Sequence, residues 1–358
     1  MFYFFLFTLS FILSISAMPL LKRLAFKYNL MIDLPNKRKM HVKATPRNGG
    51  IGIALALFSA ILLGSAMRLG VSGEDVFHII GIILGGVLIL LIGIFDDMRG
   101  MKAYPKLVGQ TFAAIILILA GIKIDAISIP FWHVVHLPLP IGIFLTIFWV
   151  LAVINALNLI DGIDALAAGV ALIASTILFI LALSQGKILM AIITISLIGS
   201  CLGFLKYNYP PASLFMGDCG SMLLGFTLAA SSIQCSYKNA AAASLLIPIT
   251  ILGLPLLDTT LAIVRRLWKK QSPFHADKEH VHHQLLSLGL NNKRALLILY
   301  GLSGFLGIVA IIATLVSEDI SAIVITVAGA ILIIILLLLS KFNNKRNGMS
   351  KTKKIVPV

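Results

Sequence analysis

Two adjacent carboxylates, Asp96 and Asp97, end a long apolar run in a chain that has few charged residues. Like charges this close repel one another, and a divalent cation relieves that repulsion. Mg²⁺ usually takes one or two protein carboxylates and fills the rest of its shell with water and substrate phosphate. The pair therefore predicts a site for a cation and a phosphate.

A second polar segment carries Asn155, Asn158, Asp161 and Asp164 at intervals of three residues. This spacing keeps successive side chains close together on a helix, and Gly162 favours a bend or an end of the helix. Hydrogen bonding between helices would explain an amide here, but it does not explain two acids as well. We therefore predict that the segment is functional.

A third segment, Phe215-Met-Gly217-Asp218-Cys-Gly220-Ser221, has the composition of a helix start. Gly217 and Gly220 allow the backbone to approach a ligand closely, and the N–H groups of a helix N-terminus bind anions. Taken alone, the segment is better explained by ordinary turn and capping chemistry, with Asp218 as the N-cap.

Four of the eight histidines lie within nine residues: His275, His280, His282 and His283. Histidine is a zinc ligand, although no cysteine contributes here. Histidine is equally suited to donating hydrogen bonds to phosphate, and both interpretations stay open.

A fifth segment, from Asp33 to Gly50, contains Lys43 among several other basic residues. Gly49 and Gly50 open the next apolar run and are compatible with a phosphate at a helix start. The basic residues are explained equally well as determinants of membrane topology.

The apolar runs between these segments define the fold class. The chain is 59% hydrophobic and 12% charged, against roughly 45–50% and 25% in soluble domains. Eleven runs approach or exceed the length needed to cross about 30 Å of hydrocarbon. Two of them (107–122 and 217–233) are short, and a count of ten applies if one of these does not span. The runs are 2–21, 50–67, 76–95, 107–122, 139–158, 163–183, 187–204, 217–233, 243–264, 295–316 and 319–340.

Continuous runs exclude a β-barrel, so we predict an all-α polytopic membrane protein with 10 or 11 transmembrane helices. Residues 1–340 are expected to form one catalytic domain, and 341–358 a basic cytoplasmic tail.

The basic residues predict the orientation. All but four of the 29 Lys and Arg residues fall in one set of connections and the tail, which the positive-inside rule places in the cytoplasm. The first run has no basic residue before it and several after it, so it is expected to be retained with the N-terminus outside. The predicted cytoplasmic active-site loops are 22–49, 96–106, 205–218 and 265–294.

The net charge of +15 is explained by this topology, and no soluble domain presents a basic face, so nucleic acid is not an expected partner. Most acids gather at the same cytoplasmic face. That distribution favours chemistry between a cytosolic solute and a lipid head group over transport, which usually needs polar groups near mid-bilayer. A transporter is kept as a remote alternative.

Taken in chain order, the five segments resemble the polyprenyl-phosphate N-acetylhexosamine-1-phosphate transferase family. The resemblance implies transfer of a sugar 1-phosphate from a UDP-sugar to undecaprenyl phosphate, with release of UMP and with Mg²⁺ (or Mn²⁺) as the cofactor. His-x-His-His after Asp-Lys-Glu is similar to the WecA and TagO branch, which uses UDP-N-acetylglucosamine. Another UDP-N-acetylhexosamine and UDP-MurNAc-pentapeptide stay open as substrates.

The resemblance also implies roles for individual residues. Asp218, with Asn158, would bind the metal, and Asp96 and Asp97 would act in catalysis beside the metal and the lipid phosphate.

The remaining implied roles concern the substrate. Catalytic contacts to the diphosphate or sugar would come from His280, His282 and His283. The nucleotide pocket would be lined by Asn158, Asp161 and Asp164, and the uridine part would be near Lys43, Asn208 and Phe215.

The implied setting is the bacterial cytoplasmic (inner) membrane, at the start of O-antigen, enterobacterial common antigen or teichoic-acid synthesis. The expected partners are the UDP-sugar, the polyprenyl phosphate and the bilayer, and a homodimer is allowed. A phosphate monoester is largely dianionic at neutral pH because its second pKa is near 6, so direct attack by the lipid phosphate needs no strong base. A covalent intermediate on Asp96 or Asp97 stays open as the rival mechanism.

Overall fold

The computed structural model describes residues 1–34, 44–67, 73–128, 134–235, 246–272 and 280–353. Within these residues the chain is almost entirely helical, with two small two-stranded sheets. The elements in chain order are α1 (Phe2–Tyr28), β1 (Ile32–Asp33), β2 (Thr45–Pro46), α2 (Gly49–Met67), α3 (Gly73–Arg99), α4 (Ala103–Leu119), β3 (Ala126–Ser128), β4 (Val134–His136), α5 (Leu139–Ile160), α6 (Leu166–Ser184), α7 (Ile188–Asn208), α8 (Gly217–Cys235), α9 (Leu246–Ile251), α10 (Gly253–Trp268), α11 (Val281–Ser287), α12 (Asn292–Leu315) and α13 (Glu318–Lys353).

Eight helices of the described part are long and apolar enough to cross a membrane, which confirms the all-α polytopic fold. They are α1, α2, α3, α5, α6, α7, α12 and residues Asp319–Leu339 of α13. The helix count from the apolar runs was higher because three runs behave differently. Two of them form α4, which has only 17 residues, and α8.

The third exception is the run 243–264, which was expected to form one helix. Instead α9 ends at Ile251 and α10 begins at Gly253. Proline has no N–H to donate, and its ring crowds the carbonyl four residues earlier. Pro255 thus cannot continue a regular helix past Ile251, and the single-helix expectation is wrong here.

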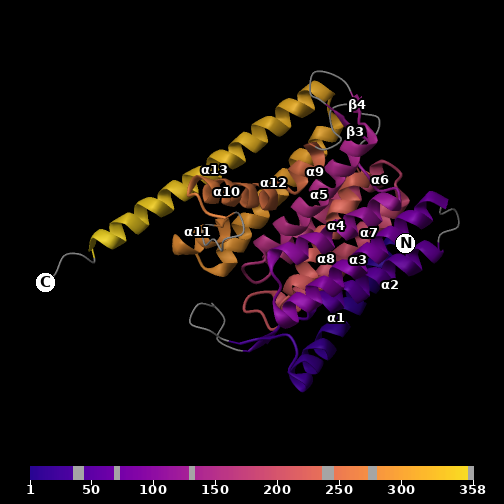
Figure 1. The fold of residues 1–358 in the computed structure, drawn as a ribbon, viewed down its shortest axis with the longest axis horizontal. Helices are drawn as coiled ribbons and strands as arrows, with labels where there is room; N and C mark the ends of the chain where they lie inside the picture. The colour runs from indigo at the N-terminus through magenta and orange to yellow at the C-terminus, as the bar shows by residue number, and fades with distance from the viewer. Residues whose placement is uncertain (35–43, 68–72, 129–133, 236–245, 273–279, 354–358) are drawn as a thin grey trace.

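The helices form a bundle in which α8 is central. It packs against α2, α3, α5, α6 and α7. On the other side of the bundle α12 packs against α6, α9 and α13, and α13 continues past the bundle through residues 341–353 of the expected tail. The β3–β4 hairpin lies at one end of the bundle, and α11 lies toward the opposite end (Figure 1).

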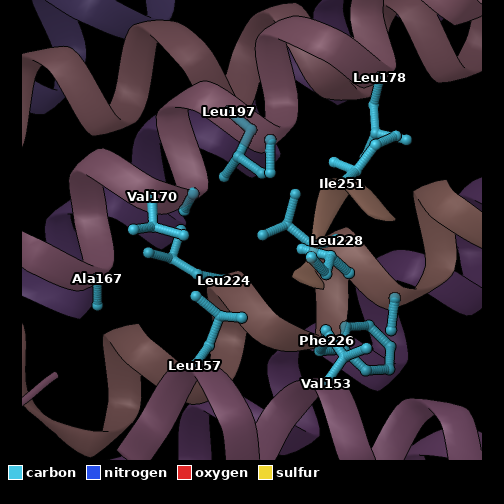
Figure 2. Close-up of a cluster of buried hydrophobic side chains, with 14 of the residues drawn as sticks. Val153, Leu157, Ala167, Val170, Leu178, Leu197, Leu224, Phe226, Leu228 and Ile251 are labelled. Carbon is cyan, nitrogen blue, oxygen red and sulfur yellow. The ribbon is translucent and has the colours of Figure 1, made fainter. Parts of the chain in front are cut away.

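The central position of α8 explains its composition. Its side chains from Cys219 to Ile233 are buried within the protein, so they do not need to be as apolar as side chains that face lipid. Figure 2 shows Leu224, Phe226 and Leu228 of α8 among side chains of α5, α6 and α7. Its glycines and serines let neighbouring backbones approach closely, as is usual between membrane helices.

Two glycines bring neighbouring helices against the first turn of α8. A Cβ on Gly93 of α3 would overlap the backbone of Cys219, and a Cβ on Gly50 of α2 would overlap the backbone of Gly220. The C-terminal end of α3, with Asp96 and Asp97, therefore lies directly beside Asp218.

Candidate active site

Asp97 holds the N-terminus of α8. Its Oδ1 accepts a hydrogen bond of 2.9 Å from the backbone N–H of Asp218, and its Oδ2 accepts one of 3.0 Å from the N–H of Cys219. The first N–H groups of a helix have no partner within the helix, and a carboxylate is favoured there. The bend at Gly217, with a φ of 75°, turns the chain into α8 at this point. Asp97 thus fixes the position of the Asp218 backbone, from which the Asp218 side chain extends.

Asp96 and Asp218 share a cation, Lys106, which lies in α4. The Lys106 ammonium contacts the Asp96 carboxylate and lies 2.7 Å from Asp218 Oδ2. Asp96 is almost fully buried, whereas one third of the Asp218 side chain is exposed. Asp218 is therefore the member of this group that a ligand can reach.

Lys106 was not singled out from the sequence. It stands in the connection 96–106, where its charge counted only toward topology. Lys106 lies in the first turn of a helix that closely follows the two aspartates. That position was the available signal for a contact with them.

Asn158 lies beside Asp218 as well. Its Nδ2 donates to Ser221 Oγ at 2.9 Å, and the proximity of the amide contributes to lowering the pKa of the Asp218 carboxyl. Residues from four helices (α3, α4, α5 and α8) therefore meet at Asp218.

Asp218 opens onto a pocket of about 1170 Å³. Ligand pockets commonly measure roughly 300–1,000 Å³, so this one has room for a nucleotide sugar. Of the residues expected to bind substrate or metal or to act in catalysis, six line it: Asp161, Asp164, Asn208, Phe215, Asp218 and His283.

Asn208 and Asp164 build the wall of the pocket. Asn208 Oδ1 accepts from Ala165 N at 2.8 Å and its Nδ2 donates to Leu214 O at 2.9 Å. Asp164 Oδ2 accepts from Ala212 N at 2.9 Å. Both side chains tie the turn after α5 to the loop before α8, an arrangement that the spacing of the motifs did not indicate.

Asp161 is the acid that lines the pocket at the end of α5. Burial raises the pKa of its carboxyl well above the usual range, and the negative charges of Asp218 and Asp97 raise it further. A cation bound between Asp161 and Asp218 would offset this repulsion.

The three described histidines of the predicted set differ in position. His280 is buried, and its Nδ1 lies 3.0 Å from Asp258 Oδ2, while Asp258 Oδ1 accepts from Val281 N at 3.0 Å. His282 is also buried and packs against Gly162. Only His283 of the three lines the pocket.

The charge of His282 follows from its burial. Burial, with a further contribution from His283, lowers the pKa of its ring to about 3. The neutral form of the ring is therefore favoured in this environment. Asp258 of α10 anchors the start of α11 through its contacts with His280 and Val281.

Lys43 lies outside the described residues. Three other cations line the pocket among the described residues: Lys22 of α1, Lys293, and Arg47, whose Nη2 donates to Asp33 Oδ2 at 2.7 Å. The basic segment around Lys43 contained Arg47, and Lys293 follows the histidine segment closely, but neither was distinguished from topology charges by its sequence.

No group of three or more His, Cys, Asp or Glu side chains in the described part of the chain is arranged to hold a metal ion. The zinc interpretation of the histidines gains no support there. Mg²⁺ needs fewer protein ligands, because water and phosphate complete its shell. Asp218 and Asp161, two carboxylates facing one pocket, fit that requirement.

Comparison with known proteins identifies the family. Residues 79–236, which carry the aspartates of the site, match the profile of glycosyl transferase family 4. A probable undecaprenyl-phosphate N-acetylglucosaminyl 1-phosphate transferase of Bacillus subtilis is 38% identical over 80% of this chain and 78% of its own length. A decaprenyl-phosphate N-acetylglucosaminephosphotransferase of Mycolicibacterium smegmatis is 36% identical over 75% of this chain and 72% of its own length.

A more distant relative, the undecaprenyl-phosphate alpha-N-acetylglucosaminyl 1-phosphate transferase of Yersinia pestis, is 27% identical over 87% of this chain and 82% of its own length. The similarity thus extends over most of the chain, including the segments that meet at Asp218. The chain belongs to glycosyl transferase family 4.

Proposed function

We propose that this protein transfers N-acetylglucosamine 1-phosphate from UDP-N-acetylglucosamine to undecaprenyl phosphate and releases UMP. The observation that carries the proposal is the meeting of Asp218, Asp161, Arg47 and Lys293 at one pocket at the end of a membrane bundle. Relatives that share most of this chain's length are named for N-acetylglucosamine 1-phosphate transfer to polyprenyl phosphates. The pocket would face the cytoplasm of a bacterium, as the distribution of basic residues predicts.

The reaction requires that negative charge be offset where two phosphate groups meet. The lipid phosphate oxygen would attack the β-phosphorus, and the bond to the bridging oxygen would break as UMP leaves with that oxygen. Mg²⁺ held by Asp218 and Asp161 would supply charge neutralisation when bound. Arg47, Lys293 and His283, which line the pocket, would hold the diphosphate and sugar.

The geometry favours direct attack over a covalent intermediate. Both oxygens of Asp97 accept backbone hydrogen bonds at the start of α8. Asp96 is buried, with one oxygen accepting from Met101 N and the other paired with Lys106. Neither carboxylate presents an unoccupied oxygen to the pocket.

Direct attack predicts that no phospho-enzyme forms. We expect no label on the protein when it is incubated with Mg²⁺ and UDP-N-acetylglucosamine labelled at the β-phosphate, in the absence of lipid acceptor. Labelled protein that disappears in an Asp96→Asn or Asp97→Asn variant, and that passes its label to added undecaprenyl phosphate, would instead establish the covalent route.

The proposed function itself is tested by the leaving nucleotide. Purified protein with UDP-N-acetylglucosamine, undecaprenyl phosphate and Mg²⁺ should produce UMP, and omission of lipid or addition of EDTA should stop it. UDP as the product would mean sugar transfer without phosphate and would contradict the proposal. Parallel reactions with UDP-N-acetylgalactosamine and UDP-MurNAc-pentapeptide determine the sugar.

A further inference from the structure

A second layer of polar side chains lies one helical turn below the site, inside the bundle. Gln110 follows Lys106 by four residues on α4, and Asn155 precedes Asn158 by three residues on α5. These spacings place each deeper residue on the same helix face as the site residue next to it. The layer thus joins α4 to α5 at a greater depth than the site itself.

The two amides are bonded to each other. Asn155 Nδ2 donates to Gln110 Oε1 at 2.7 Å and also to Leu151 O of its own helix at 2.8 Å. Gln110 is completely buried, and its Nε2 lies 3.4 Å from the sulfur of Met222 on α8. One side chain of α4 therefore contacts both helices that carry Asn158 and Asp218.

The position of this pair bears on Lys106. α4 is a short helix, and its Lys106 must reach between Asp96 and Asp218, which belong to two other helices. A slide or rotation of α4 by about 1 Å would displace the ammonium, and misplacements of that size cost on the order of 10²-fold in rate. An amide buried in a membrane bundle resists such movement, because breaking its hydrogen bond leaves polar groups unpaired.

We infer that Gln110 and Asn155 are a positioning pair that holds α4 in register with α5 and α8, so that Lys106 stays between Asp96 and Asp218 during phosphosugar transfer. The pair does not touch the pocket. The inference rests on the proposed function and adds two residues that act on the reaction through Lys106.

The test uses the full-length protein in detergent with three variants: Gln110→Leu, Asn155→Leu and the double variant. We expect kcat for UMP release to fall about tenfold or more in each single variant, while KM for UDP-N-acetylglucosamine changes by less than about threefold. The double variant should be no slower than the slower single variant, because both changes break the same bond. A matched control is Thr111→Val, since the Thr111 hydroxyl donates to Leu107 O within α4.

Each outcome is decisive. Leucine variants that keep the wild-type kcat, losses that add in the double variant, or a rise in KM without a fall in kcat would overturn the inference. A fall in kcat matched by an equal loss of folded protein in size-exclusion chromatography would assign the pair to stability alone and would also overturn it. A wild-type protein that releases no UMP would overturn the proposed function and this inference together.

Discussion

An Asp218→Ala variant is expected to lose metal-dependent transfer almost completely, with kcat/KM lower by about 10³-fold or more, equivalent to roughly 4 kcal/mol. Asp218 is the exposed member of the carboxylate group, and Asn158 and Lys106 orient it from two sides. Removing its carboxylate removes the negative charge best placed to hold a cation next to the diphosphate. The measurement is UMP release as a function of Mg²⁺ concentration.

Two comparisons make that result specific. Asp125→Ala removes an exposed carboxylate that pairs with Lys123 and lies beside β3, away from the pocket, and should leave activity unchanged. Asp218→Asn keeps the shape and one acceptor oxygen, so it should retain more activity than alanine while needing more Mg²⁺. Undiminished activity of Asp218→Ala at the wild-type Mg²⁺ requirement would refute the role assigned to this residue.

Lys106→Met is expected to have the second largest effect, a fall in kcat of about 10²-fold. Methionine fills the space of the lysine stem but removes the cation that Asp96 and Asp218 share. Leaving buried carboxylates without their partner is strongly unfavourable, so the group would rearrange or take up a proton. The effect is measured by steady-state kinetics of UMP release, with the concentrations of UDP-N-acetylglucosamine and undecaprenyl phosphate varied in turn.

The control for this change is Lys102→Met. Lys102 is exposed, immediately before α4, and belongs to the same connection. It should leave kcat within about twofold of wild type. Equal losses in the two variants would show that general positive charge, rather than the contact with Asp96 and Asp218, matters at this face.

The meeting of the carboxylates could be predicted from the sequence, because each lies at the end of an apolar run on the same predicted membrane face. The structure places Asp97 against Asp218 although 121 residues separate them. The functions of individual side chains were harder to predict. Asp97, Asn208 and Asp164 accept hydrogen bonds from backbone N–H groups of distant segments, which leave no pattern in the sequence.

The number of long apolar helices in the described part differs from the expected 10 or 11 for a related reason. High hydropathy identifies helices whose side chains face lipid, but α8 is surrounded by other helices of the protein. Its moderate polarity is therefore compatible with a central position, whereas the break at Leu252 was visible in the sequence as Pro255. Lys106 was missed because a lysine beside a membrane helix has an ordinary explanation in topology.

Gly50, Gly93 and Asp97 contact the first turn of α8 closely. Substitutions at these contacts and substitutions elsewhere in the pocket therefore have different consequences during evolution. The position of the candidate active site depends on the ends of α2, α3 and α8. Their backbones lie so close together that an added methyl group has no room. Other residues that line the pocket, such as Pro211 and Asn292, lie in a loop and at the start of α12, away from these close contacts. Substitutions there can therefore change the lining of the pocket without moving the helix ends that position Asp97 and Asp218.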